Sequence, residues 1–125
     1  MSLLNLENKK ILVVEDDEMS FLYLNQLLIL ARGTFIREKT GIDAIEQFRN
    51  NRNYDLVLMD IQLPDMDGKQ VTREIRLLDA GIPIIAQTAS RSTFERELIL
   101  EAGCTDVITK PFSIDELYEV IGRYL

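Results

Sequence analysis

Short apolar runs alternate five times with segments of helical spacing along this chain, and this alternation constrains the fold more than any other feature. Three runs are rich in aliphatic residues and are typical of strands buried on both faces: 10–15, 55–59 and 82–86. Two weaker runs, 34–38 and 106–109, are assigned to strands mainly because they lie between helical segments. Five strand–helix units in succession predict an α/β fold, with a five-stranded parallel sheet and helices on both faces.

The helical segments are predicted from apolar residues spaced three or four apart. The fourth helix should stop at Gly103, and the last should begin at Ser113, whose capping box is completed by Glu116. The first helix should bury one stripe of side chains, namely Met19, Tyr23, Leu27 and Ala31.

The bulk properties predict one domain, residues 1–125, because the chain is close to the commonest domain size. Residues 1–8 are interpreted as an N-terminal extension whose first three residues could derive from a cloning vector.

A net charge of -7 without a run of basic residues argues against direct nucleic-acid binding. No apolar run approaches the roughly 20 residues that cross a bilayer, so we expect no membrane insertion and a cytoplasmic location. A single cysteine, Cys104, and no histidine argue against disulfides, zinc and histidine-based catalysis.

Acidic residues follow two of the predicted strands. Glu15, Asp16 and Asp17 follow the first, and Asp60 follows the third. Ligands bind at the carboxyl ends of the strands in such sheets, so at least two of these carboxylates should converge if the strands are neighbours. Like charges about 4 Å apart repel by roughly 4 kcal/mol at an effective dielectric of 20, so such a pocket needs a proton or a cation. Oxygen ligands favour Mg²⁺, although the acidic triplet alone could equally cap a helix or face solvent.

Two further polar residues fall at the same predicted edge. Thr88 ends the fourth strand region, and Lys110 ends the fifth and precedes Pro111. A hydroxyl and an ammonium could contact phosphoryl oxygens there, although threonine also suits strands and lysine suits surfaces. After Asp60, a turn containing proline and glycine leads into the third helix, with Asp67 as its expected cap.

Four segments in order, ILVVEDD, LVLMDIQLPDMDG, IIAQTAS and EAGCTDVITKPF, make this chain resemble the receiver (response-regulator) domains of two-component signalling from about Lys9 to Leu125. The resemblance implies a flavodoxin-like (βα)5 fold with strand order 2-1-3-4-5. It also implies that Asp60 accepts a phosphoryl group from a phosphohistidine on a histidine kinase or a histidine phosphotransfer domain. The family does this in a self-catalysed reaction with slow self-dephosphorylation, followed by a switch in conformation or partner binding, and without being a turnover enzyme.

The resemblance also assigns a metal site. Mg²⁺, with Mn²⁺ as a substitute, would be bound by Asp16, Asp60 and the backbone carbonyl of Gln62. Glu15 would act through a metal-bound water, and Asp17 would lie just outside the site.

Thr88 and Lys110 would contact the phosphoryl group, and Pro111 would shape the following loop, with a cis bond before it as a possibility. Receiver domains commonly carry an aromatic residue three positions before the lysine, which turns inward when the threonine moves. Val107 occupies that position here and is too small for the same swing. The threonine–aromatic route is therefore in doubt, whereas chemistry at Asp60 does not depend on it.

Three further apolar residues of the first helix, Phe21, Leu22 and Ile29, lie away from its predicted buried stripe. They could form a docking surface for a kinase helix bundle beside the acidic pocket. They could also belong to a wider buried face or be ordinary scattered surface residues.

Two other functions compete with a phosphorelay receiver. An aspartyl-phosphate hydrolase of haloacid-dehalogenase type would need a second acid two residues after the nucleophile, where Gln62 stands. A pseudo-receiver that only binds partners would usually have lost pocket residues. The VEDD and IQLPDMDG segments look more like the receiver of a hybrid sensor histidine kinase than a stand-alone regulator.

Overall fold

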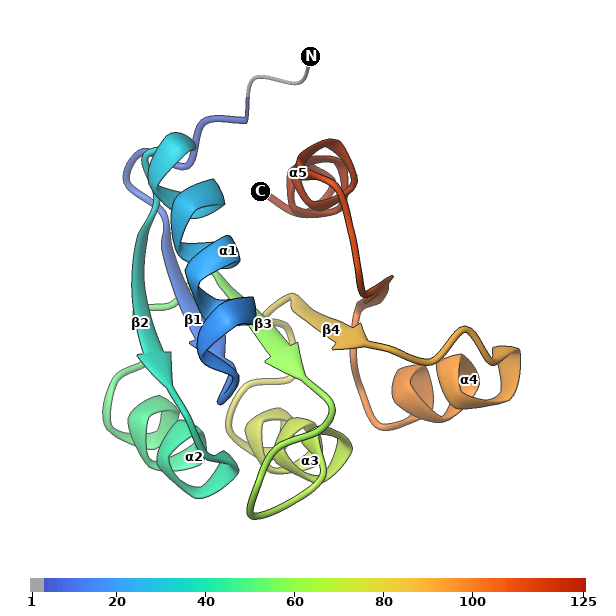
Figure 1. The fold of residues 1–125 in the computed structure, drawn as a ribbon. Helices are drawn as coiled ribbons and strands as arrows, with labels where there is room; N and C mark the ends of the chain where they lie inside the picture. Colours follow the sequence, from blue (N-terminus) through green and yellow to red (C-terminus); the bar gives the residue numbers. More distant parts are fainter. Residues whose placement is uncertain (1–3) are drawn as a thin grey trace.

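The computed structural model describes residues 4–125, which form one parallel sheet between two layers of helices (Figure 1). The strands are β1 (Lys10–Val14), β2 (Thr34–Glu38), β3 (Leu56–Asp60), β4 (Ile84–Thr88) and β5 (Asp106–Thr109). The helices are α1 (Glu18–Leu30), α2 (Gly41–Asn50), α3 (Gly68–Leu78), α4 (Thr93–Glu101) and α5 (Ile114–Gly122). The strands pair in the order β2-β1-β3-β4-β5, all parallel, which confirms the predicted α/β class and strand order.

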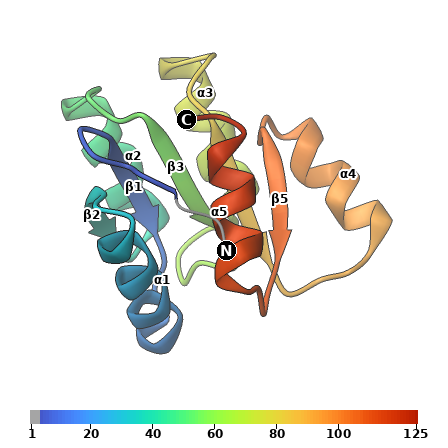
Figure 2. The same ribbon diagram turned by 90° about the horizontal axis from the view of Figure 1, so that it is seen from above.

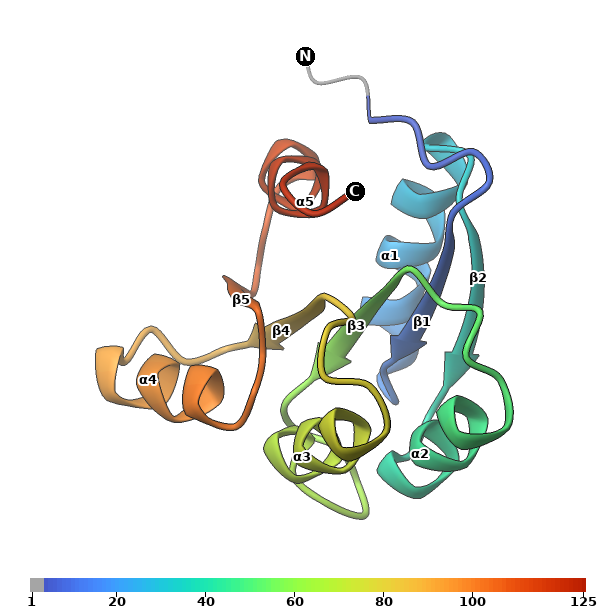
Figure 3. The same cartoon turned by 180° about the vertical axis from the view of Figure 1, so that it is seen from behind.

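The helices divide unequally between the two faces of the sheet. Figures 1 and 3 show α1 and α5 on one face and α2, α3 and α4 on the other. Seen from above in Figure 2, α4 lies at the outer side of the molecule, beyond β5. Because helices cover both faces, every residue of β3 and β4 is buried, and this explains why both strands are apolar up to the polar residues at their carboxyl ends.

Two strands begin later than the sequence predicted. β3 begins one residue after Asp55, whose carboxylate instead accepts the backbone N–H of Lys10 at 2.8 Å. β4 begins after Pro83, which has no N–H to donate, although its carbonyl accepts from Val57 at 2.9 Å.

The predicted buried stripe of α1 was wrong in its first half. Met19 is 74% exposed and Tyr23 is 39% exposed. The Tyr23 hydroxyl donates to the carbonyl of Phe112 at 2.8 Å, which directs this ring toward the β5–α5 loop instead of the core. The side chains that α1 and its C-terminal cap bury are Leu24, Leu27, Leu28 and Ala31.

Helix starts follow their capping residues closely. Asp67 caps α3, and Ser113 with Glu116 forms the capping box of α5, both as predicted. Gly103 follows the end of α4 with a φ of 116°. Part of the predicted N-terminal extension packs on the body, since Leu6 is fully buried and its N–H donates to the Ala31 carbonyl at 2.7 Å. The first three residues of that extension lie outside the described residues, and among residues 4–125 no helix has the length and apolar character to cross a membrane.

Candidate functional site

The carboxyl ends of four strands meet at one edge of the sheet and carry the polar residues singled out in the sequence. Asp60 ends β3 and lies opposite Gln87 of β4, while Thr88 ends β4 opposite Thr109 of β5. Glu15 and Lys110 follow β1 and β5 directly. The topology therefore brings residues from distant parts of the chain to one site.

The acidic cluster comprises Glu15, Asp16 and Asp60. One carboxylate oxygen from each lies within 4.8 Å of the others. Glu15 is fully buried and Asp60 is 7% exposed, so water screens their charges poorly. Asp17 has a separate structural role: it caps α1 by accepting the Ser20 N–H at 2.8 Å, and its hydrogen bonds with Ser20 lower the pKa of Asp17.

Asp60 carries the strongest electrostatic perturbation in this cluster. Burial, followed by the contact with Glu15, raises the pKa of Asp60 to about 7, against the opposing effects of Lys110 and the Gln62 amide. The Lys110 ammonium lies 2.8 Å from Glu15 Oε1 and 3.7 Å from Asp60 Oδ2. One ammonium cannot neutralise three carboxylates, so the cluster gains from an added cation. Its donors are all hard oxygens, and this set fits Mg²⁺.

The loop after Asp60 packs tightly on the acceptor strand. The Gln62 N–H donates to Asp60 Oδ1 at 3.1 Å, and the Gly68 N–H donates to the Ile61 carbonyl at 2.8 Å. A Cβ at Gly68 would overlap the Asp60 carbonyl oxygen and the Ile61 Cα. Only glycine therefore fits where the loop enters α3.

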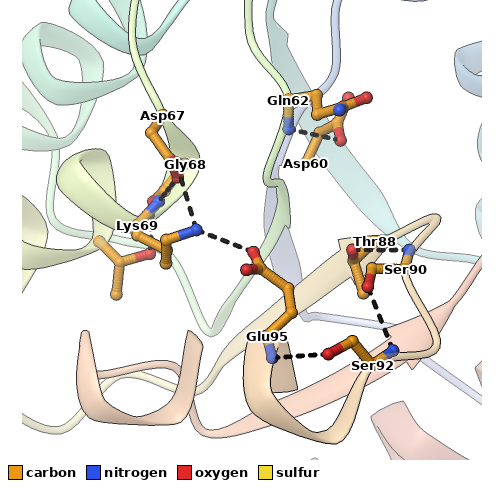
Figure 4. Close-up of polar contacts among 10 residues, drawn as sticks. Asp60, Gln62, Asp67, Gly68, Lys69, Thr88, Ser90, Ser92 and Glu95 are labelled. Atoms are coloured by element: carbon orange, nitrogen blue, oxygen red, sulfur yellow. Dashed lines mark hydrogen bonds and ion pairs between the residues drawn. The ribbon is translucent and has the colours of Figure 1, made fainter. Parts of the chain in front are cut away.

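Thr88 and Lys110 approach the site from its other side. Thr88 is 8% exposed, and its hydroxyl accepts the Ser90 N–H at 3.1 Å (Figure 4). The peptide bond between Lys110 and Pro111 is cis, in agreement with the sequence expectation. Val107, at the position where the family commonly has an aromatic residue, is buried in the core between the sheet and the layer of α2, α3 and α4.

Two residues that support the site were missed in the sequence. Arg37 of β2 donates to the carbonyls of Glu15 and Asp16 at 2.9 and 3.3 Å and fixes the end of the acidic segment. A basic residue in the strand beside the acidic strand was the available signal. Asp65 accepts the N–H groups of Gly41 and Ile42 at 2.8 and 2.9 Å and ties the loop after β3 to α2. Nothing in the sequence near Asp65 indicated this contact.

The predicted docking residues separate into two kinds. Leu22 is 51% exposed and Ile29 is 60% exposed. Phe21 is half-buried and packs edge-on against Phe35, with ring centroids 6.0 Å apart. A groove of about 700 Å³ separates the start of α1 from the β5–α5 loop and is lined in part by Lys110.

Comparison with known proteins identifies the family to which this fold belongs. Residues 11–122 match the family model of the response regulator receiver domain. The chain is 36% identical over 119 residues to the polar-differentiation response regulator DivK of Brucella anthropi, which covers 94% of this chain and 96% of DivK.

Solved structures agree as well. The receiver domain of a sensor histidine kinase from Pseudomonas aeruginosa, solved with a magnesium ion in its active-site cleft, superposes with a TM-score of 0.86 at 36% identity and covers 93% of this chain and 96% of that one. The receiver domain of a Saccharomyces cerevisiae response regulator, co-crystallised with a histidine phosphotransfer protein, has the same fold, with a TM-score of 0.87 at 24% identity over 99% of this chain and 91% of that one. The chain belongs to the response regulator receiver domain family of two-component signalling.

Proposed function

We propose that this receiver domain accepts a phosphoryl group from a phosphohistidine onto Asp60, in a reaction that requires Mg²⁺ and is catalysed by the domain itself. The observation that supports this most is the position of Asp60. It is a buried carboxylate within 4.8 Å of two other acids, with an ammonium 3.7 Å away and a threonine hydroxyl on the adjacent strand. A carboxylate that only stabilised the fold would not be placed beside two further carboxylates, because their mutual repulsion destabilises the folded state.

The metal would be bound by Asp16, Asp60 and the backbone carbonyl of Gln62, with Glu15 acting through water. When bound, Mg²⁺ or Mn²⁺ neutralises charge on the phosphoryl oxygens. The chain's own residues do the rest. An Asp60 oxygen forms the new bond to phosphorus as the bond from phosphorus to the donor imidazole breaks.

Lys110 and Thr88 then stabilise the transferred group. Glu15 holds the Lys110 ammonium at 2.8 Å, which positions it to contact a phosphoryl oxygen, and the Thr88 hydroxyl donates to another. Pro111 shapes the backbone that presents Lys110. Water attack on the aspartyl phosphate would later reverse the modification slowly.

The donor is a histidine kinase or a histidine phosphotransfer domain, because this chain has no histidine of its own. A donor that draws its phosphoryl group from ATP places the encounter in the cytoplasm. The similarity to a receiver of a sensor histidine kinase is consistent with an origin in a hybrid kinase. The competing hydrolase is disfavoured because Gln62 stands where its general acid would be, and the pseudo-receiver because the acidic cluster and Lys110 are all present.

The proposal is tested by incubation with acetyl phosphate and Mg²⁺, followed by measurement of the intact mass. The wild type should gain one phosphoryl group, and Asp60→Asn should gain none. Undiminished labelling of Asp60→Asn would show that the acceptor is another residue.

A metal titration tests the acidic pair separately. Asp16→Asn should weaken Mg²⁺ binding by about tenfold or more, as loss of a carboxylate ligand does, whereas Asp17→Asn should chiefly destabilise the start of α1. If Asp17→Asn weakened binding more, Asp17 would be the ligand.

A further inference from the structure

Arg37, near the end of β2, holds the backbone of the acidic segment (Glu15–Asp17) that follows β1. β2 pairs with β1, and the Arg37 side chain, which is only 13% exposed, lies beside that segment. Its Nε donates to the Glu15 carbonyl at 2.9 Å, and its Nη2 donates to the Asp16 carbonyl at 3.3 Å. One planar side chain therefore binds the first two carbonyls of the acidic segment.

Arg37 is itself fixed by contacts with α1. Its Cζ lies 4.1 Å from the centroid of the Phe21 ring, and its Nη1 and Nη2 donate to the Glu18 carboxylate at 3.3 and 3.1 Å. A guanidinium is planar and rigid, so its donors keep fixed directions while one face lies against the aromatic ring. The acidic segment therefore cannot shift relative to β2 and α1 without breaking several contacts of Arg37.

Asp16 depends more on this support than the other two acids of the cluster. Glu15 and Asp60 are buried, and the carboxylate of each accepts a hydrogen bond. Asp16 is exposed, and within residues 4–125 it is held by the Arg37 bond to its carbonyl and not through its carboxylate. The position of the Asp16 carboxylate in the cluster is therefore set through its backbone.

We propose that Arg37 is a positioning residue that makes the acidic site selective for Mg²⁺ over the larger Ca²⁺, because it holds the backbone that carries Asp16. This inference rests on the proposed metal site at Asp16 and Asp60. Mg²⁺ demands near-ideal octahedral geometry, whereas Ca²⁺ accepts variable numbers and arrangements of oxygen ligands. A firmly held Asp16 thus favours Mg²⁺, and a loosely held one removes this advantage.

The positive charge of Arg37 would act in the opposite direction. A cation beside a dication site repels the metal, so loss of this charge alone should tighten the binding of Mg²⁺ and Ca²⁺ to a similar extent. Loss of positioning should instead weaken Mg²⁺ binding and affect Ca²⁺ binding less. The two roles therefore differ in the sign of the effect and in the ratio of the two affinities.

Isothermal titration calorimetry of the unmodified protein with MgCl₂ and with CaCl₂, at one pH and ionic strength, separates these roles. Arg37→Met keeps an unbranched side chain beside Phe21 but removes the donors, so it should weaken Mg²⁺ binding by about tenfold and Ca²⁺ binding by less than about threefold. Arg37→Lys keeps the charge but lacks the planar fork, so it should also lose selectivity. A ratio of affinities measured on one protein is not altered by a fraction of inactive molecules.

Lys39→Gln is the matched control. Lys39 follows β2 directly, is 61% exposed and lies 3.2 Å from the same Glu18 carboxylate, but it makes no hydrogen bond to Glu15 or Asp16. Its replacement removes one positive charge from this side of the site without releasing the acidic segment. The ratio of Mg²⁺ to Ca²⁺ affinity should therefore stay at the wild-type value.

Selectivity for Mg²⁺ in the wild type that is lost in both Arg37 variants and kept in Lys39→Gln would support the proposal. A wild-type affinity ratio in Arg37→Met or in Arg37→Lys, including equal weakening or equal tightening of both ions, would overturn it and leave the proposed function standing. A wild type that binds no Mg²⁺ would refute the metal site of the proposed function and this inference with it.

Discussion

Gln87 lines the groove between α1 and the β5–α5 loop, and both polar atoms of its buried side-chain amide lack a hydrogen-bond partner among the described residues. It lies in β4 between the acceptor strand and β5, on the same face of the sheet as Ile85. A buried unpaired amide costs roughly 1–3 kcal/mol. Gln87→Leu has a similar volume and removes both groups, so it should raise the free energy of unfolding by about 1–3 kcal/mol.

Urea denaturation measures this change, with Gln26→Leu as the control. Gln26 is exposed on α1, so its replacement should alter stability by less than about 0.5 kcal/mol. A Gln87→Leu protein that is less stable than the wild type would show that the amide is paired in solution.

The raised pKa of Asp60 predicts how stability depends on pH in the absence of metal. The folded-state pKa is about 7, against 3.8 for an unperturbed carboxyl, so the folded state holds this proton more tightly than the unfolded state. The contribution of Asp60 to stability is therefore complete below the unfolded pKa and is lost as pH rises through about 7. Asp60→Asn cannot ionise and should avoid this loss.

Denaturation in a chelating buffer at two pH values shows whether Asp60 loses or gains stabilising effect as the pH rises. At about pH 8, Asp60→Asn should be more stable than the wild type by on the order of 1–4 kcal/mol, and the difference should nearly vanish at about pH 4. Added Mg²⁺ should stabilise the wild type at the higher pH and have little effect on the variant. A difference that grew toward low pH would mean that Asp60 is ionised and favourably paired in the metal-free protein.

The site residues differ in how far the sequence could indicate them. Glu15, Asp60, Thr88 and Lys110 stand at strand ends, and parallel topology alone brings these positions to one edge. The contacts of Arg37 and Asp65 depend on which strands, loops and helix starts lie against each other across the fold. Such tertiary contacts leave no local pattern in the sequence from which they could be predicted.

At the scale of elements, the alternation of strands and helices was enough to predict the order and number of elements. Short apolar runs indicate buried strands, whereas apolar residues spaced three or four apart indicate helices, so the two patterns are easily distinguished. The rotation of α1 about its axis was not predictable, since apolar residues occur nearly all round this helix. Its buried side was decided by tertiary contacts, among them the Tyr23 hydroxyl bond to the Phe112 carbonyl. As a result, Leu22 and Ile29 face outward.

The exposed apolar residues of α1 predict that this helix contacts the phosphohistidine protein during phosphoryl transfer. Leu22→Glu should slow phosphoryl transfer from the cognate phosphohistidine protein by about tenfold, the effect of losing a central interface contact. Labelling by acetyl phosphate should hardly change, because a small donor needs only the pocket. Rapid-quench measurement of both rates distinguishes these effects.

Ile42→Glu is the matched control, because Ile42 is 61% exposed on α2, in the opposite helix layer. It should slow neither reaction. Equal losses with both donors in Leu22→Glu would indicate a folding defect, and unchanged rates with both would remove Leu22 from the interface.

At the scale of the whole molecule, the fold separates its functions in space. The acidic cluster lies at the carboxyl edge of the sheet, and the exposed apolar residues of α1 lie on one of its faces. The chain has a net charge of -7, and three of its carboxylates repel one another within the acidic cluster. A dication and a phosphoryl group would be bound together at this cluster. All of these roles depend on Asp60 being the acceptor.

The most direct test of that claim is to trap the acyl phosphate with borohydride, which reduces a phosphorylated aspartate to homoserine, and to locate the product by peptide sequencing. After reaction with acetyl phosphate and Mg²⁺, homoserine should appear at position 60 and nowhere else, and chelation of the metal should abolish it. Homoserine at position 16 or 17, or equal yield without metal, would contradict the account.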